Sequence, residues 1–64
     1  MNIQQLRYVV AIANSGTFRE AAEKMYVSQP SLSISIKDLE TELGFQIFSR
    51  TSSGTFLTQK GMDF

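Results

Sequence analysis

Residues 27–40 read VSQPSLSISIKDLE, and this stretch decides the fold. Leu32, Ile36, Leu39 and Leu43 recur at intervals of three and four residues, which is the spacing of one face of an α-helix. The side chains between them are mostly serine or charged. We therefore predict an amphipathic helix over residues 29–43 whose aliphatic face is buried in a core.

The ends of this helix are marked by local chemistry. Ser28 is a good N-cap, and Pro30 suits the first turn, where its missing N–H costs little. Gly44 follows Leu43 and is well suited to the left-handed conformation that closes a helix.

The side chains on the outer face near the start of this helix are small, short and mostly uncharged. A helix needs such a face to lie close to the base edges of DNA. Glutamine can pair with adenine, serine with several base edges, and an apolar side chain with a thymine methyl group. The opposing interpretation is that Ser28 is only a cap and that the other serines form a solvated face. The candidate residues on this face are Ser28, Gln29, Pro30, Ser31, Ser33, Ile34 and Lys37.

Two shorter helices are predicted before it. Residues 3–14 form the first, capped by Asn2 and ended by Gly16, and its apolar stripe is expected to be Ile3, Leu6, Val9, Val10 and Ala13. Residues 18–25 form the second. Its capping box is Thr17 with Glu20, and its apolar stripe is Phe18, Ala21, Ala22 and Met25. The paired alanines predict a close helix crossing.

The pattern changes after Gly44. Residues 46–50 and 55–58 alternate polar and apolar side chains around a turn-rich segment, which predicts a two-stranded hairpin. Thr58 can cap a further helix that starts at Gln59. The fold class is therefore mainly α: a winged helix-turn-helix with a three-helix core and a β-hairpin wing. We expect the domain to cover residues 1–58 and its helix-turn-helix motif about 18–37.

The wing offers a second set of candidate contacts. Arg50 can reach a phosphate or the minor groove, although a surface salt bridge is the simpler interpretation. Thr51, Ser52 and Ser53 can donate to phosphates, or can simply form the turn. The remaining large side chains are assigned to the core: Phe18, Met25, Phe45, Phe48 and Phe56.

Composition narrows the class of protein. The chain has 64 residues, no cysteine and no histidine, so the usual general base, disulfides and the common zinc ligands are absent. We therefore expect no enzyme, no metal and no cofactor. Six basic and six acidic residues balance, which argues against purely electrostatic nucleic-acid binding. No apolar run is long enough to span a membrane, so a cytoplasmic location is expected.

Several motifs in order along the chain carry a family resemblance. They are LRYVVA at 6–11, SGTF at 15–18, VSQPSLS at 27–33, IKDLE at 36–40, LG at 43–44, IFSR at 47–50 and LT at 57–58 with Gly61. With these motifs the chain resembles the N-terminal DNA-binding domain of LysR-type transcriptional regulators.

The resemblance implies a bacterial regulator that binds double-stranded operator DNA. Residues 59–64 would begin a linker helix that leads to an effector-sensing domain. Through this helix and that domain the full-length regulator would form a homodimer or a dimer of dimers. A small-molecule effector would bind only the effector-sensing domain. Family positions facing DNA match Gln29, Pro30, Ser31, Ser33, Ile34 and Lys37, and wing positions match residues 50–53. Ser53 replaces a usual arginine, and Ile34 a usual polar or basic residue.

Two functions of different classes follow. The first is sequence-specific DNA binding for transcription regulation, with helix 29–43 in the major groove and the wing on the backbone or in the minor groove. The alternative is a winged-helix protein-interaction module without DNA binding, which the balanced charge and an exposed Ile34 allow. The salt dependence of binding distinguishes the two functions, because the affinity of phosphate contacts falls steeply as the salt concentration rises. The affinity of an apolar protein contact would barely change.

Overall fold

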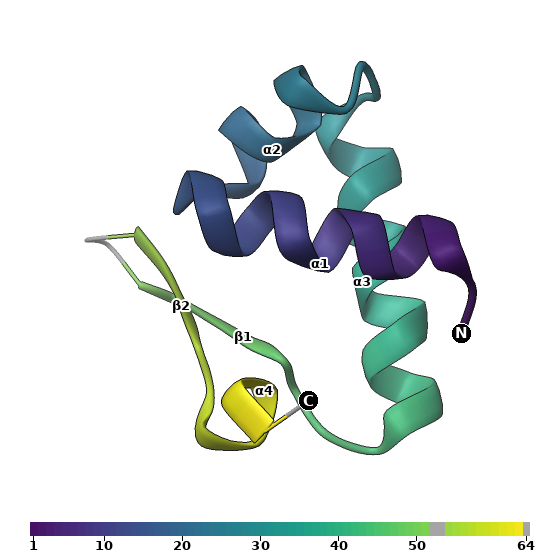
Figure 1. Cartoon of the computed structure of the whole chain (residues 1–64), viewed down its shortest axis with the longest axis vertical. Helices are drawn as coiled ribbons and strands as arrows, with labels where there is room; N and C mark the ends of the chain where they lie inside the picture. Colours follow the sequence, from purple (N-terminus) through teal and green to yellow (C-terminus); the bar gives the residue numbers. More distant parts are fainter. Residues whose placement is uncertain (52–53, 64) are drawn as a thin grey trace.

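The computed structural model describes residues 1–51 and 54–63, which form three packed helices, a two-stranded hairpin and a short final helix (Figure 1). The helices are α1 (Ile3–Ser15), α2 (Phe18–Lys24), α3 (Gln29–Leu43) and α4 (Gln59–Asp63), and the strands are β1 (Phe48–Thr51) and β2 (Gly54–Leu57). The winged helix-turn-helix predicted from the sequence is confirmed. The helix bounds agree with prediction to within a residue, and the strands are shifted by one or two residues.

Local side-chain chemistry explains where the helices begin. The Asn2 side chain accepts from the Gln5 backbone N–H at 2.8 Å, and the Gln5 side chain accepts in return from the Asn2 N–H at 3.0 Å. Thr17 Oγ1 accepts from the Glu20 N–H at 3.1 Å. These contacts satisfy backbone donors that have no partner inside a helix.

The core lies where α1, α2 and α3 cross, and it continues under the base of the hairpin (Figure 1). Each large aliphatic side chain buried there contributes on the order of 2 kcal/mol. Ala21 and Ala22, at which a close helix crossing was predicted, are both buried. The buried side chains are Tyr8, Ile12, Phe18, Ala21, Ala22, Leu32, Ile36, Leu39, Ile47 and Phe48.

The predicted apolar stripe of α1 was wrong. Ile3 is 70% exposed, Val10 is 58% exposed, and Leu6 and Ala13 also face solvent, while Val9 is half-buried. The helix instead buries Tyr8 and Ile12, which lie one turn apart on the face that meets α2 and α3. Helix α1 carries apolar side chains on more than one face, so periodicity alone could not choose between them.

Phe56 was also assigned wrongly to the core. It is 54% exposed on β2, opposite Ser49 of β1. Successive side chains of a strand point to opposite faces, so a two-stranded wing packed on one side leaves the other in solvent. Phe18 and Phe48 are buried as predicted, with their rings 5.8 Å apart edge to face. Met25 and Phe45 are half-buried against the core.

The hairpin is an antiparallel pair whose register runs from Phe48 opposite Leu57 to Thr51 opposite Gly54. On its β2 side, the Thr55 N–H donates to the carbonyl of Gly16 at the end of α1, at 3.1 Å. An isolated two-stranded hairpin is marginally stable in water, so contacts of this kind decide where the wing lies.

Candidate nucleic-acid interface

The first turn of α3 presents the small polar surface that the sequence predicts. Ser28, Gln29, Pro30 and Ser31 are all exposed. Ser28 is also the N-cap, because its Oγ accepts from the Ser31 N–H at 3.2 Å and donates to Ser31 Oγ at 2.8 Å. The hydroxyl of Ser28 is therefore occupied in the free domain, whereas Gln29 extends into solvent at the tip.

The inward and outward faces of α3 are sorted as predicted. Leu32, Ile36 and Leu39 are buried, with at most 2% of each exposed, and Leu43 is half-buried against the core at the end of the helix. Ile34 is 62% exposed and Lys37 is also exposed on the outer side of the same helix. An apolar and a cationic side chain therefore follow the polar tip along one surface.

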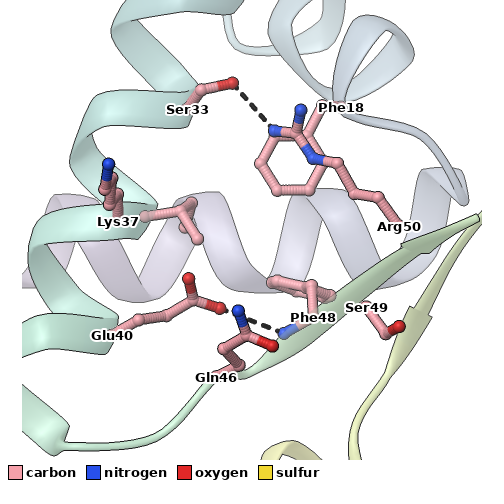
Figure 2. Close-up of a pocket in the computed structure, with 9 residues that line it drawn as sticks. Phe18, Ser33, Lys37, Glu40, Gln46, Phe48, Ser49 and Arg50 are labelled. Atoms are coloured by element: carbon pink, nitrogen blue, oxygen red, sulfur yellow. Dashed lines mark hydrogen bonds between the residues drawn. The ribbon is translucent and has the colours of Figure 1, made fainter.

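The wing approaches this surface through Arg50, as Figure 2 shows. Arg50 Nη2 donates to Ser33 Oγ at 2.9 Å, and the guanidinium lies over the Phe18 ring at 3.6 Å from its centre. Within the described residues Arg50 forms no ion pair, so the salt-bridge interpretation of this residue is not the one found. Ser33 is half-buried, and its hydroxyl oxygen accepts this bond from the wing.

Glu40 fastens the base of the wing to α3. Its Oε2 accepts from the backbone N–H of Ile47 at 2.7 Å. It also accepts from the backbone N–H of Phe48 at 3.2 Å (Figure 2). A carboxylate that accepts two N–H groups forms stronger bonds than a neutral acceptor does. We did not predict this role from the sequence, where Glu40 was one of several acids late in the helix. The sequence signal for this role was weak, because it consisted only of the position of Glu40 four residues before Gly44.

A shallow hollow separates α3 from the wing. On the α3 side it is bordered by the hydroxyl of Ser33 and the ammonium of Lys37. On the β1 side it is bordered by the hydroxyl of Ser49 and the guanidinium of Arg50. The lining side chains are Phe18, Ser33, Ile36, Lys37, Glu40, Gln46, Phe48, Ser49 and Arg50 (Figure 2).

The remaining wing candidates are placed only in part. Thr51 is exposed at the end of β1, and its hydroxyl donates to the Gly54 carbonyl at 3.2 Å. Ser52 and Ser53 lie outside the described residues. Their predicted contacts with phosphates stay predictions.

The described part of the chain offers neither a metal site nor a membrane span. Residues 1–51 and 54–63 hold no cluster of three acidic, histidine or cysteine side chains suited to a metal ion. None of the helices described is both long and apolar enough to cross a bilayer.

Comparison with known proteins assigns the family. The family model described as "Bacterial regulatory helix-turn-helix protein, lysR family" matches residues 3–62. The transcriptional regulator TfdT of Cupriavidus pinatubonensis is 45% identical over 64 residues, which is 100% of this chain and 28% of the relative. The dual regulator OxyR of Escherichia coli is 50% identical over 62 residues, covering 97% of this chain and 20% of that protein. The chain thus spans less than a third of these relatives.

Solved structures share this fold. The crystal structure of a CbnR_DBD–DNA complex superimposes with a TM-score of 0.94 at 36% identity, covering 100% of this chain and 74% of that one. A BenM_DBD complex with benA site 1 DNA gives a TM-score of 0.94 at 41% identity, covering 100% and 72%. The relatives are regulators rather than enzymes, in line with the prediction from composition. The chain belongs to the lysR family of bacterial regulatory helix-turn-helix proteins.

Proposed function

We propose that this domain binds double-stranded DNA sequence-specifically to regulate transcription, with the start of α3 in the major groove and the wing on the backbone or in the minor groove. The observation that carries the proposal is the exposed, small-side-chain tip of α3 beside a hollow bordered by Lys37 and Arg50. Similar domains occur in the DNA complexes of CbnR and BenM. Of the two predicted functions, the comparisons favour DNA binding over a protein-interaction module.

The proposed base-reading residues are those exposed at the tip and along the outer face of α3. Gln29 has the bidentate amide that suits adenine, and Ile34 has the apolar surface that suits a thymine methyl group. Lys37, Arg50 and Thr51 are proposed to contact phosphates, which position the domain but carry little sequence information. The proposed set is Ser28, Gln29, Pro30, Ser31, Ser33, Ile34, Lys37, Arg50, Thr51, Ser52 and Ser53.

The test measures fluorescence anisotropy of labelled duplexes over a range of salt. Duplexes are first selected from a bacterial genome by retention on the domain. The logarithm of the affinity should fall with the logarithm of salt concentration, by about 0.9 for each phosphate neutralised. Gln29→Ala should cost about 1–3 kcal/mol on the selected site and relax preference at one or two base pairs.

Thr41→Ala is the matched control, because Thr41 is exposed near the far end of the same helix. It should leave affinity and base preference unchanged. An unaltered preference profile for Gln29→Ala would remove that residue from the reading surface. Binding that ignores salt would contradict the proposed function itself.

We further propose that the regulator is a homodimer or a dimer of dimers in the bacterial cytoplasm, where α4 begins a linker helix to an effector-sensing domain. The proposal has two supports. Full-length regulators of the family are much longer than this chain. In addition, the apolar side chains of Ile3, Leu6 and Val10 on α1 are exposed. Joining two copies through a dimeric coiled coil should raise affinity for a two-half-site operator by roughly 10²–10⁴. Equal affinities for the single and the joined domain would refute this arrangement.

A further inference from the structure

We infer that Arg50 and Ser33 act as positioning residues, forming a brace that fixes the wing against the recognition helix α3. The brace is defined here as Arg50 with its two partners, Ser33 of α3 and Phe18 of α2. This inference rests on the proposed function, because it explains how the helix and the wing are presented together to one DNA duplex.

The geometry of Arg50 differs from that of a free surface cation. The guanidinium is stacked on the Phe18 ring at 3.6 Å, and one of its N–H groups is donated to Ser33 Oγ at 2.9 Å. A planar guanidinium can stack and donate at the same time, whereas a lysine ammonium has neither the plane nor the fork. Three segments that lie 15 to 32 residues apart in sequence therefore meet at one side chain (Figure 2).

The brace acts on the α3 side of the hairpin, at Arg50, whose partner in the register is Thr55 of β2. Glu40 holds the base of the strand at Ile47 and Phe48, and the Gly16 carbonyl holds β2 at Thr55. Arg50 lies two residues beyond Phe48, toward the hairpin turn. An isolated two-stranded ribbon is marginally stable, so its orientation depends on such contacts, and Arg50 adds one from α3 at the level where the Gly16 carbonyl already holds β2 from the end of α1.

The brace also changes what Ser33 can do. A serine hydroxyl accepts and donates, and here the acceptor side is occupied by Arg50. Its proton stays available to a phosphate oxygen, and the neighbouring guanidinium polarises that proton. Ser33 and Arg50 therefore contribute to DNA binding as one unit, and their substitutions should not have independent effects.

The first measurement needs no DNA. Residual dipolar couplings of backbone amides in the 64-residue chain report how the hairpin is oriented relative to α3. Ser33→Ala and Arg50→Lys should each reduce or reorient the couplings of β1 and β2 and leave those of α1 and α3 unchanged. Ser49→Ala is the matched control, because Ser49 is exposed on β1 and lines the same hollow. Its couplings should match the parent chain.

The second measurement is a double-mutant cycle on DNA affinity and its salt slope. Ser33→Ala and Arg50→Lys should each weaken binding by roughly 5- to 20-fold, with the salt slope unchanged, and the double variant should be no weaker than either single variant. Denaturation midpoints are recorded alongside, so that affinities are compared only where every variant is folded.

Two results would overturn the brace. One is unchanged hairpin couplings in both variants. The other is an Arg50→Lys variant with full affinity whose effect multiplies with that of Ser33→Ala, which would make Arg50 an independent point charge on a phosphate. If the parent chain shows no salt-dependent DNA binding, the proposed function fails, while the dipolar couplings still decide whether the brace exists.

Discussion

Replacing Gly61 with alanine tests how closely α4 packs on the base of the wing. Gly61 is buried, and an ideal Cβ at this position would lie 2.2 Å from the Ile47 carbonyl oxygen and 3.0 Å from its carbon. That oxygen also accepts the Thr58 N–H at 2.9 Å. Because the obstacle is backbone that already holds a hydrogen bond, it cannot turn aside as a flexible side chain would.

The expected magnitude comes from two opposing effects. Alanine is a better helix former than glycine and would by itself stabilise the domain by roughly 0.5–1 kcal/mol. Removing the overlap requires α4 and the Ile47 backbone to separate by roughly 1 Å, and overpacking of this kind costs about 1–3 kcal/mol. Weakening the Thr58 hydrogen bond adds about 1 kcal/mol.

The net prediction is a loss of about 2 kcal/mol, and a domain of this size has a total stability of only roughly 3–10 kcal/mol. The melting temperature should then fall by roughly 10 °C. Urea denaturation followed by circular dichroism measures the change directly. Met62→Ala, at the exposed neighbouring position, is the control and should stay within about 0.5 kcal/mol of the parent. A Gly61→Ala chain as stable as the parent, or more stable, would refute the close packing.

Three further predictions concern stability. Leu39→Ala should lower the free energy of unfolding by about 2–5 kcal/mol in urea, since Leu39 is fully buried, and a loss below 1 kcal/mol would contradict its place in the core. Glu40→Ala should cost about 2 kcal/mol and speed amide hydrogen exchange at Ile47 and Phe48, while Glu40→Gln keeps an acceptor and should cost less; equal losses would argue against the two N–H bonds. Tyr26→Gly should raise stability by about 0.5–1 kcal/mol in thermal denaturation, because Tyr26 has φ 58° and is 95% exposed, and a destabilised variant would show that its ring makes a needed contact.

Helix ends were predictable because their causes lie within four residues along the chain. The capping side chains of Asn2, Thr17 and Ser28 each reach a backbone N–H three residues ahead. Gly44 adopts the left-handed conformation that was expected of it. The buried face of α3 was equally predictable, since all of its large aliphatic side chains except the exposed Ile34 follow a single helical stripe.

The choice of buried face on α1 needed the tertiary structure. This helix offers Ile3, Leu6 and Val10 on one side and Tyr8 with Ile12 on another, and both patterns fit a helical period. Burial goes to the side that the crossing helices cover, and their positions depend on the whole packing arrangement.

The contacts that hold the wing against α3 could not be predicted from the sequence either. Residues 27–40 by themselves determine a helix with an aliphatic inner face and a small polar start, because cap chemistry and helical period act over short range. Only the folded chain brings Arg50 to Ser33, 17 residues away, and the Glu40 carboxylate to the N–H groups of β1. Contacts of this range depend on how helices and hairpin settle against a shared core, which no local pattern encodes.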